Sequence, residues 1–196
     1  MSIMLLLVMI SIISFALAQQ QPDLVFDMDG NILRAGTEYY ILPIYEGMGV
    51  SLTLAMTRNE SCPLDVVQAN LEVDNGLPLT FTPVDPKKEV IRESTDLNIV
   101  FSNSTMCNQS NVWMLEEYEG QMIVTGHGIS GNPGPETMNN WFKIEKYDND
   151  YKLVFCPTVC YFCKSVCEHI GVKIAENGSR RLAISDQPFK VKFVTA

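Results

Sequence analysis

Short stretches of alternating apolar and polar residues recur along most of the chain. Residues 51–56 and 79–82 alternate strictly, and a period of two predicts β-strands with one buried face. No stretch keeps a 3.6-residue apolar period over three turns. Clusters of Gly, Pro, Asn and Asp separate the strand-like segments, so the pattern predicts about a dozen short strands in a sandwich or a barrel. Further strands are expected at residues 97–101, 113–115, 121–124, 141–144, 151–155, 172–174, 181–184 and 189–193.

The segment from residue 24 to residue 43 has the strongest local pattern. Val25 and Phe26 begin a run of β-forming residues. The triplet 29–31, Asp-Gly-Asn, is a turn signal, because Gly and Asn tolerate positive φ and Asp accepts local backbone hydrogen bonds. Residues 39–42 are aromatic and branched, and Pro43 ends the pairing. We therefore expect a strand, a tight turn and a second strand.

The N-terminus has the composition of a targeting segment. The first 18 residues carry no charged side chain, and Ala16 and Ala18 place small residues at −3 and −1 relative to Gln19. This pattern predicts a cleaved secretory signal over residues 1–18. The alternative is a membrane anchor, but the run is short for a bilayer span and no basic flank follows it. Residues 19–196 then suit one exported domain with a single core.

The charge balance excludes two classes of partner. The chain has a formal net charge of −9, and its surface would repel the phosphates of a nucleic acid. The same charge argues against binding to an anionic membrane. We expect neither nucleic acid nor a membrane as a partner.

Candidate catalytic groups are few. The chain has only two histidines, His127 and His169, and no Gly-x-Ser-x-Gly motif. Asp27 and Asp29 could form a carboxylate pair for glycoside chemistry, but their place in a turn signal favours a structural role. Cys160-x2-Cys163 has the spacing of zinc ligands, but an oxidising compartment favours a disulfide there. We expect no enzyme activity, no cofactor and no metal site.

The N-terminal pattern resembles the signature of the plant Kunitz protease inhibitors of soybean-trypsin-inhibitor type, which include the miraculin-like proteins. Its elements are an aliphatic residue two before Asp27, the Asp29-Gly30 pair, Leu33, Tyr39 and Ile41. The resemblance implies an all-β fold, a β-trefoil of twelve short strands, and a secreted, extracellular (apoplastic) or vacuolar protein. Further blocks that resemble the family occur in the expected order at residues 59–68, 141–145, 151–157 and 179–183.

Six cysteines in an exported chain indicate disulfides, and six cysteines allow fifteen pairings. The family pattern implies Cys62–Cys107 as a long bridge, worth roughly 4 kcal/mol on the chain-entropy model. It also implies a bridge in the third unit, which here holds four cysteines. We favour the nested pairing of the miraculin-like members over the rival pairing, which joins Cys156 to Cys160 and Cys163 to Cys167. The nested pairs are Cys156–Cys167 and Cys160–Cys163.

Asn-x-Ser/Thr sequons predict N-glycosylation on surface loops of a secreted protein. Two of them flank Cys107, so we expect one of those two to be occupied rather than both. The four candidate asparagines are Asn59, Asn103, Asn108 and Asn177.

The family's reactive loop lies between its fourth and fifth strands, which corresponds here to residues 82–92. Pro83 and Pro86 restrict φ and favour an extended, exposed loop. Alignment backward from residues 97–101 puts the specificity residue, P1, at Lys87, with Lys88 as the second choice. Alignment forward from residue 82 puts it at Asp85, which a trypsin-like pocket would reject. The expected protease-binding loop is Pro83, Val84, Asp85, Pro86, Lys87 and Lys88.

Two features leave alternatives open. Ala35 stands where the family places an asparagine that braces the reactive loop, so the loop here could be softer and the protein a non-inhibitory storage or recognition trefoil. Lys173, just beyond the cysteine cluster, is an alternative basic anchor, although its alternation with its neighbours predicts an outward-facing strand residue. The expected partner of this monomeric inhibitor is a trypsin-like serine endopeptidase, with a serine carboxypeptidase or a cysteine protease as alternatives.

Overall fold

The computed structural model describes residues 21–44, 51–69, 76–103, 105–164 and 166–196. The expected secretory signal, residues 1–18, lies outside them. Within the described ranges no helix is both long enough and apolar enough to span a bilayer.

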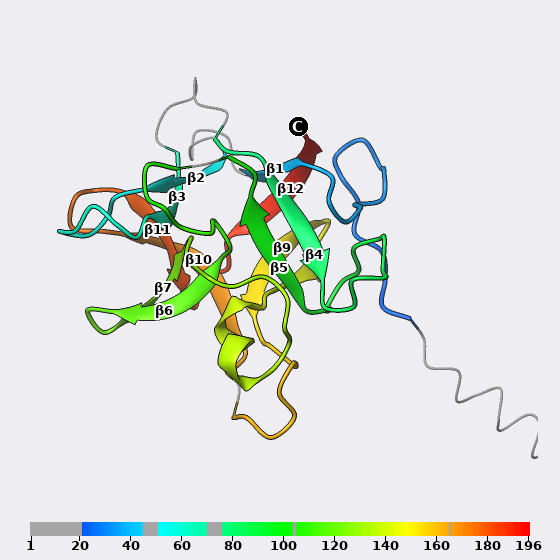
Figure 1. Ribbon diagram of the computed structural model, residues 1–196. Helices are drawn as coiled ribbons and strands as arrows, with labels where there is room; N and C mark the ends of the chain where they lie inside the picture. Colours follow the sequence, from blue (N-terminus) through cyan, green and yellow to red (C-terminus); the bar gives the residue numbers. More distant parts are fainter. Residues whose placement is uncertain (1–20, 45–50, 70–75, 104, 165) are drawn as a thin grey trace, which may run out of the picture.

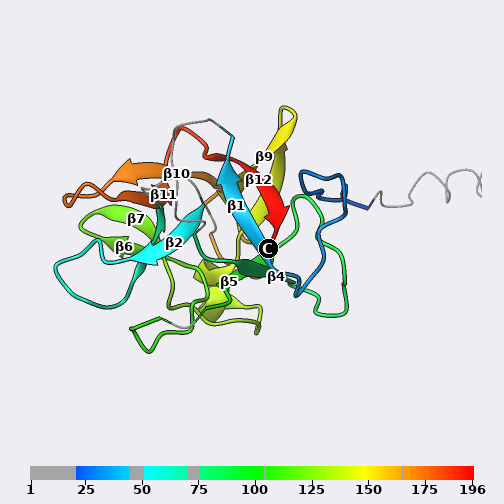
Figure 2. The same cartoon turned by 90° about the horizontal axis from the view of Figure 1, so that it is seen from above.

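Six strands form a closed barrel (Figure 1, Figure 2). Antiparallel pairing joins β12 to β1, β1 to β4, β4 to β5, β8 to β9 and β9 to β12. The ring closes between β5 and β8, where the backbones of Leu97 and Phe142 exchange hydrogen bonds of 2.9 and 3.0 Å. The barrel strands are β1 (Tyr39–Pro43), β4 (Leu79–Pro83), β5 (Leu97–Phe101), β8 (Lys143–Tyr147), β9 (Asp150–Phe155) and β12 (Lys190–Thr195).

Three hairpins close one end of the barrel and lie together on the left of Figure 1. One strand of each hairpin pairs with the next, since β3 pairs with β7 and β11, and β11 pairs with β7. This threefold arrangement of four-strand units confirms the expected β-trefoil. The hairpins are β2 (Leu52–Ala55) with β3 (Asp65–Gln68), β6 (Met114–Tyr118) with β7 (Gln121–Thr125), and β10 (Glu168–Ile174) with β11 (Arg180–Ile184); the 3₁₀ helix η1 (Pro135–Asn140) precedes β8.

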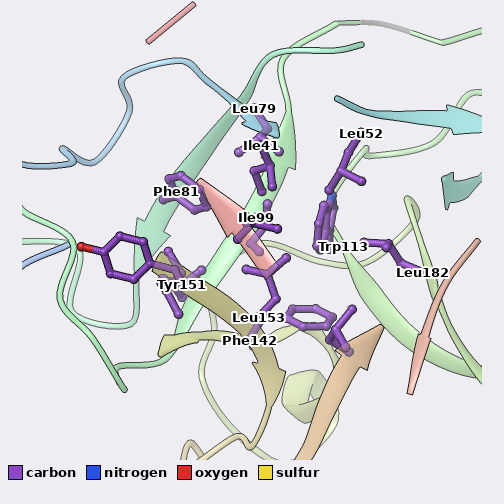
Figure 3. Close-up of a cluster of buried hydrophobic side chains, with 14 of the residues drawn as sticks. Ile41, Leu52, Leu79, Phe81, Ile99, Trp113, Phe142, Tyr151, Leu153 and Leu182 are labelled. Carbon is purple, nitrogen blue, oxygen red and sulfur yellow. The ribbon is translucent and has the colours of Figure 1, made fainter. Parts of the chain in front are cut away.

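Aromatic side chains fill the junction between barrel and cap (Figure 3). Trp113 packs edge-on against Phe142 at a centroid distance of 5.8 Å, and Phe142 packs in the same way against Phe155. Leu52 and Leu182 reach this cluster from the cap, and both are fully buried. Burial of this surface supplies the main stabilising term of the fold.

Two sequence expectations about strands need correction. Residues 24–26 do not form a regular strand, because they make only isolated bridges, Leu24 with Arg92 and Phe26 with Ile32. Conversely, the pattern did not indicate β3, since all four of its residues are buried, and two of them, Asp65 and Gln68, are polar.

Candidate functional site

The connection between β4 and β5 carries the two lysines at 87 and 88. Residues 85–89 are exposed, whereas Val84 and Val90 on either side are partly covered. In Figure 1 this connection lies at the right of the barrel, beside the N-terminal segment. We call residues 83–88 the basic loop.

The apex of the basic loop is a hydrogen-bonded turn. The Lys88 N–H donates to the Asp85 carbonyl at 3.0 Å, and the Lys87 N–H donates to Asp85 Oδ1 at 3.1 Å. Asp at the first position of a turn and Pro at the second favour this conformation. The expectation of an extended loop is therefore wrong between Asp85 and Lys88, although both lysines are exposed as expected.

The two lysines differ in what surrounds them. A surface hollow with a volume of about 310 Å³ lies beside the basic loop, and Lys88 lines it together with Pro83, Val90 and Arg92. Lys87 is not among the residues that line this hollow. Both side chains are exposed, and of the two only Lys88 borders the hollow.

The N-terminal segment braces the C-terminal side of the loop through its backbone. The Ala35 N–H donates to the Glu89 carbonyl at 2.9 Å, and the Ile91 N–H donates to the Leu33 carbonyl at 2.9 Å. The Val25 N–H in turn donates to the Ile91 carbonyl at 3.1 Å. Backbone hydrogen bonds thus connect the loop to the body at the position where the side chain of Ala35 offers none.

The bracing segment is itself held by a buried carboxylate. Asp27 Oδ1 accepts the N–H of Asn31 at 2.8 Å and the N–H of Asp29 at 3.0 Å, and Gly30 takes the positive φ of 82° that this turn needs. Desolvation raises the pKa of Asp27, but hydrogen bonds from Asn31, Asp29 and Thr195 outweigh it and the pKa is lowered. Asp27 is therefore a structural anion, and its contacts are those of a turn.

Asp96 holds the opposite side of the loop, and no sequence motif indicated it. Its carbonyl accepts the Val84 N–H at 2.9 Å. Its buried carboxylate accepts the Thr158 N–H at 3.1 Å and the Thr158 hydroxyl, and lies 3.7 Å from Lys143 Nζ. Residues 85–88 lie between this anchor and the anchor at Glu89. Their backbones make no hydrogen bond to the other described residues of the protein.

Residues 25–195 match the family described as trypsin and protease inhibitors of the legume Kunitz type. The chain belongs to this Kunitz family. Miraculin from Synsepalum dulcificum is 48% identical over 186 residues, which cover 90% of this chain and 84% of the relative. Kunitz trypsin inhibitor 5 from Arabidopsis thaliana is 45% identical over 172 residues, which cover 88% of this chain and 85% of the relative. The structure of a Kunitz-type cysteine protease inhibitor from potato matches with a TM-score of 0.77 at 32% identity, covering 90% of this chain and 98% of that one.

All six cysteines of this Kunitz protein are paired. The bonds are Cys62–Cys107, Cys156–Cys167 and Cys160–Cys163, the pairing that the family resemblance implies. The Cys160–Cys163 pair is therefore a disulfide, and the described residues contain no cluster of side chains suited to a metal ion.

Lys173 lies in a regular strand. It belongs to β10, faces solvent, and sits opposite Arg181 of β11 in the register. Lys173 faces solvent, but the expected alternation does not hold, because the neighbouring Ile174 is 63% exposed as well. Because β11 occupies the backbone groups on one side, Lys173 lacks the free loop that an anchor for a protease needs.

The four sequon asparagines, Asn59, Asn103, Asn108 and Asn177, are all exposed. Asn177 also accepts the Ser179 N–H at 3.0 Å and donates to the Met56 carbonyl at 2.9 Å. Exposure leaves each of them accessible to a glycan, so glycosylation at these positions stays a prediction.

His127, one of the two histidines, belongs to a charged network in the cap. His127 Nε2 lies 3.1 Å from Glu116, and Glu116 also pairs with Arg58. Arg58 in turn pairs with the fully buried Asp65 at 2.8 Å. Desolvation lowers the pKa of Arg58, but hydrogen bonds to Asp65 and Glu116 outweigh it and the pKa is raised. His127 Nδ1 lies 2.7 Å from the hydroxyl of the fully buried Thr125. The cluster joins the 57–58 segment to β3 and β6.

Proposed function

We propose that this protein is a secreted inhibitor of trypsin-like serine endopeptidases, and that Lys87 is the residue that enters the specificity pocket. A carboxylate at the base of such a pocket selects Lys or Arg. The observation that carries the proposal is the exposure of Lys87 within a four-residue span that is anchored at both ends. Membership of a family of trypsin and protease inhibitors supports it.

Anchoring matters because it reduces the cost of binding. A loop that is already ordered loses little conformational freedom when a protease cleft closes around it. Val84 is held by Asp96, and Glu89 is held by Ala35. The remaining cost is the opening of the turn, because the Lys87 N–H must leave Asp85 before it can pair with the protease.

Once bound, the loop behaves as a substrate that is cleaved slowly. The protease's serine would attack the Lys87 carbonyl, and the two anchors would keep the new Lys88 amine beside the acyl group. Re-formation of the peptide bond would then compete with release. The same geometry explains why a loose loop would be an ordinary substrate.

A panel of three variants tests the site. Trypsin is titrated with the wild-type protein and with Lys87→Ala, Lys88→Ala and Lys173→Ala. We expect the wild-type protein to inhibit trypsin stoichiometrically. Lys87→Ala should weaken this inhibition at least about 100-fold, as for a central interface anchor. Lys173→Ala should leave it unchanged. Equal inhibition by wild type and Lys87→Ala would refute the role of Lys87. Loss of inhibition in Lys173→Ala alone would move the site to β10.

One observation favours a second candidate function, that of a non-inhibitory binding or storage trefoil. The turn at Asp85–Lys88 occupies backbone N–H groups that a substrate-like loop offers to a protease. Failure of the protein to inhibit serine endopeptidases, serine carboxypeptidases and cysteine proteases would favour this function over inhibition.

A further inference from the structure

The largest exposed aromatic surface of the described residues lies far along the chain from the basic loop. Tyr161 is 96% exposed and Phe162 is 67% exposed. Their rings pack edge-to-face at a centroid distance of 5.1 Å. Aromatic side chains of this size normally bury most of their surface, and exposed ones on a rigid loop are typical anchors of protein interfaces.

This pair sits at the apex of a doubly cross-linked segment. Cys160 and Cys163, which flank the two aromatic residues, form one disulfide. Cys156 and Cys167 form a second disulfide outside the first. Thr158, at the start of the segment, is fixed to the buried Asp96. We call residues 160–163 the aromatic turn. In Figure 1 the segment between β9 and β10 that carries it projects from the bottom of the barrel.

The backbone at the apex is available for intermolecular pairing. Among the described residues, no hydrogen bond involves the N–H or C=O of Tyr161 or Phe162. A serine protease binds the backbone of the P1 residue, whose carbonyl oxygen enters the oxyanion hole. The P1 side chain enters the specificity pocket. The basic loop, by contrast, uses its Lys87 and Lys88 N–H groups internally.

We propose that the aromatic turn is a second, independent protease-binding site, which presents Tyr161 as P1 to serine endopeptidases with an apolar pocket selective for aromatic residues. The disulfide spans the bond that such an enzyme would cut. The enzyme's serine oxygen bonds to the Tyr161 carbonyl carbon, the Tyr161–Phe162 C–N bond breaks, and the serine proton passes to the Phe162 nitrogen. Because Cys160–Cys163 holds the new amine beside the acyl group, attack by that amine restores the peptide bond and returns the proton to the serine.

Bovine chymotrypsin is the probe for this site. We expect the wild-type protein to inhibit chymotrypsin competitively. Tyr161→Ala should raise the inhibition constant about 100-fold. Val166→Ala, at a neighbouring exposed apolar residue, should leave the inhibition constant unchanged. Lys87→Ala should also leave it unchanged, so failure at this site and failure at the basic loop are distinguishable.

An exchange of specificity gives a second readout. The double variant Lys87→Ala/Tyr161→Lys should inhibit trypsin much more strongly than Lys87→Ala alone. Absence of chymotrypsin inhibition, rapid cleavage after Tyr161 without inhibition, or equal inhibition by Tyr161→Ala would each overturn the proposal. So would a wild-type dimer in sedimentation that Tyr161→Ala dissociates, because the aromatic turn would then be occupied by a second copy of the chain.

Discussion

Replacement of Asp96 by alanine should destabilise the protein strongly. The carboxylate is 5% exposed, accepts two hydrogen bonds from Thr158 and lies 3.7 Å from Lys143 Nζ. Lys143 is also buried, and the only other polar contact of its ammonium in the described residues is a 3.4 Å hydrogen bond to the Thr158 hydroxyl. Asp96→Ala therefore leaves a buried ammonium without its counter-charge, which costs about 3–5 kcal/mol.

Urea unfolding with the disulfides intact measures this cost. With a slope of about 2 kcal/mol per molar, the midpoint of Asp96→Ala should fall by about 2 M. The double variant Asp96→Ala/Lys143→Met should recover about half of the loss, because both charges are then absent. Asp186→Ala, at an exposed loop position, is the matched control and should leave the midpoint unchanged. A loss below about 1 kcal/mol for Asp96→Ala would refute the reasoning, because that is the value of an exposed ion pair.

Two other substitutions test the scaffold around the proposed sites. Asp27 has a lowered pKa in the folded protein, so its stabilising contribution is present above its unfolded pKa of about 3.9 and is lost as pH falls through the folded value. Asp27→Asn should therefore lower the thermal midpoint at pH 7 and reduce its dependence on pH below 4; an unchanged acid slope would contradict this. Gly171→Ala would place a Cβ 2.3 Å from the Gln187 carbonyl oxygen and should cost about 1–3 kcal/mol in urea unfolding. Gly134→Ala, with nothing within 4 Å, should cost much less, and equal losses would exclude the steric explanation.

Alternation along the chain predicted most barrel strands because their two faces differ. β4 has the burial pattern of a strand with one face in the core, and its sequence alternates accordingly. β3 has no such pattern, because Asp65 and Gln68 are buried against the arginines 58 and 180 of other segments. Arg180 is 112 residues from Gln68 in the sequence, and buried polar residues at both ends of the strand hide its alternation, so the alternation rule did not find this strand.

The exposure of the basic loop was predicted from the sequence, but its turn was missed, although Asp85 and Pro86 are residues that favour a turn. The prolines and lysines indicated an exposed segment, and that exposure is observed for Lys87 and Lys88. The turn depends on the Asp85 side chain, and the anchors depend on Ala35 and Asp96, which are distant in sequence from the residues they hold or carry no motif. The exposure of the aromatic turn was not predicted either, because large apolar side chains are normally expected in a core.

The most direct test of the central claim is the mass of the protein after prolonged incubation with a catalytic amount of trypsin, with the disulfides reduced before analysis. The account predicts a persistent mixture of intact protein and a single product hydrolysed between Lys87 and Lys88, with inhibitory activity retained throughout. Progressive conversion into many fragments, or an intact chain that leaves trypsin fully active, would contradict it.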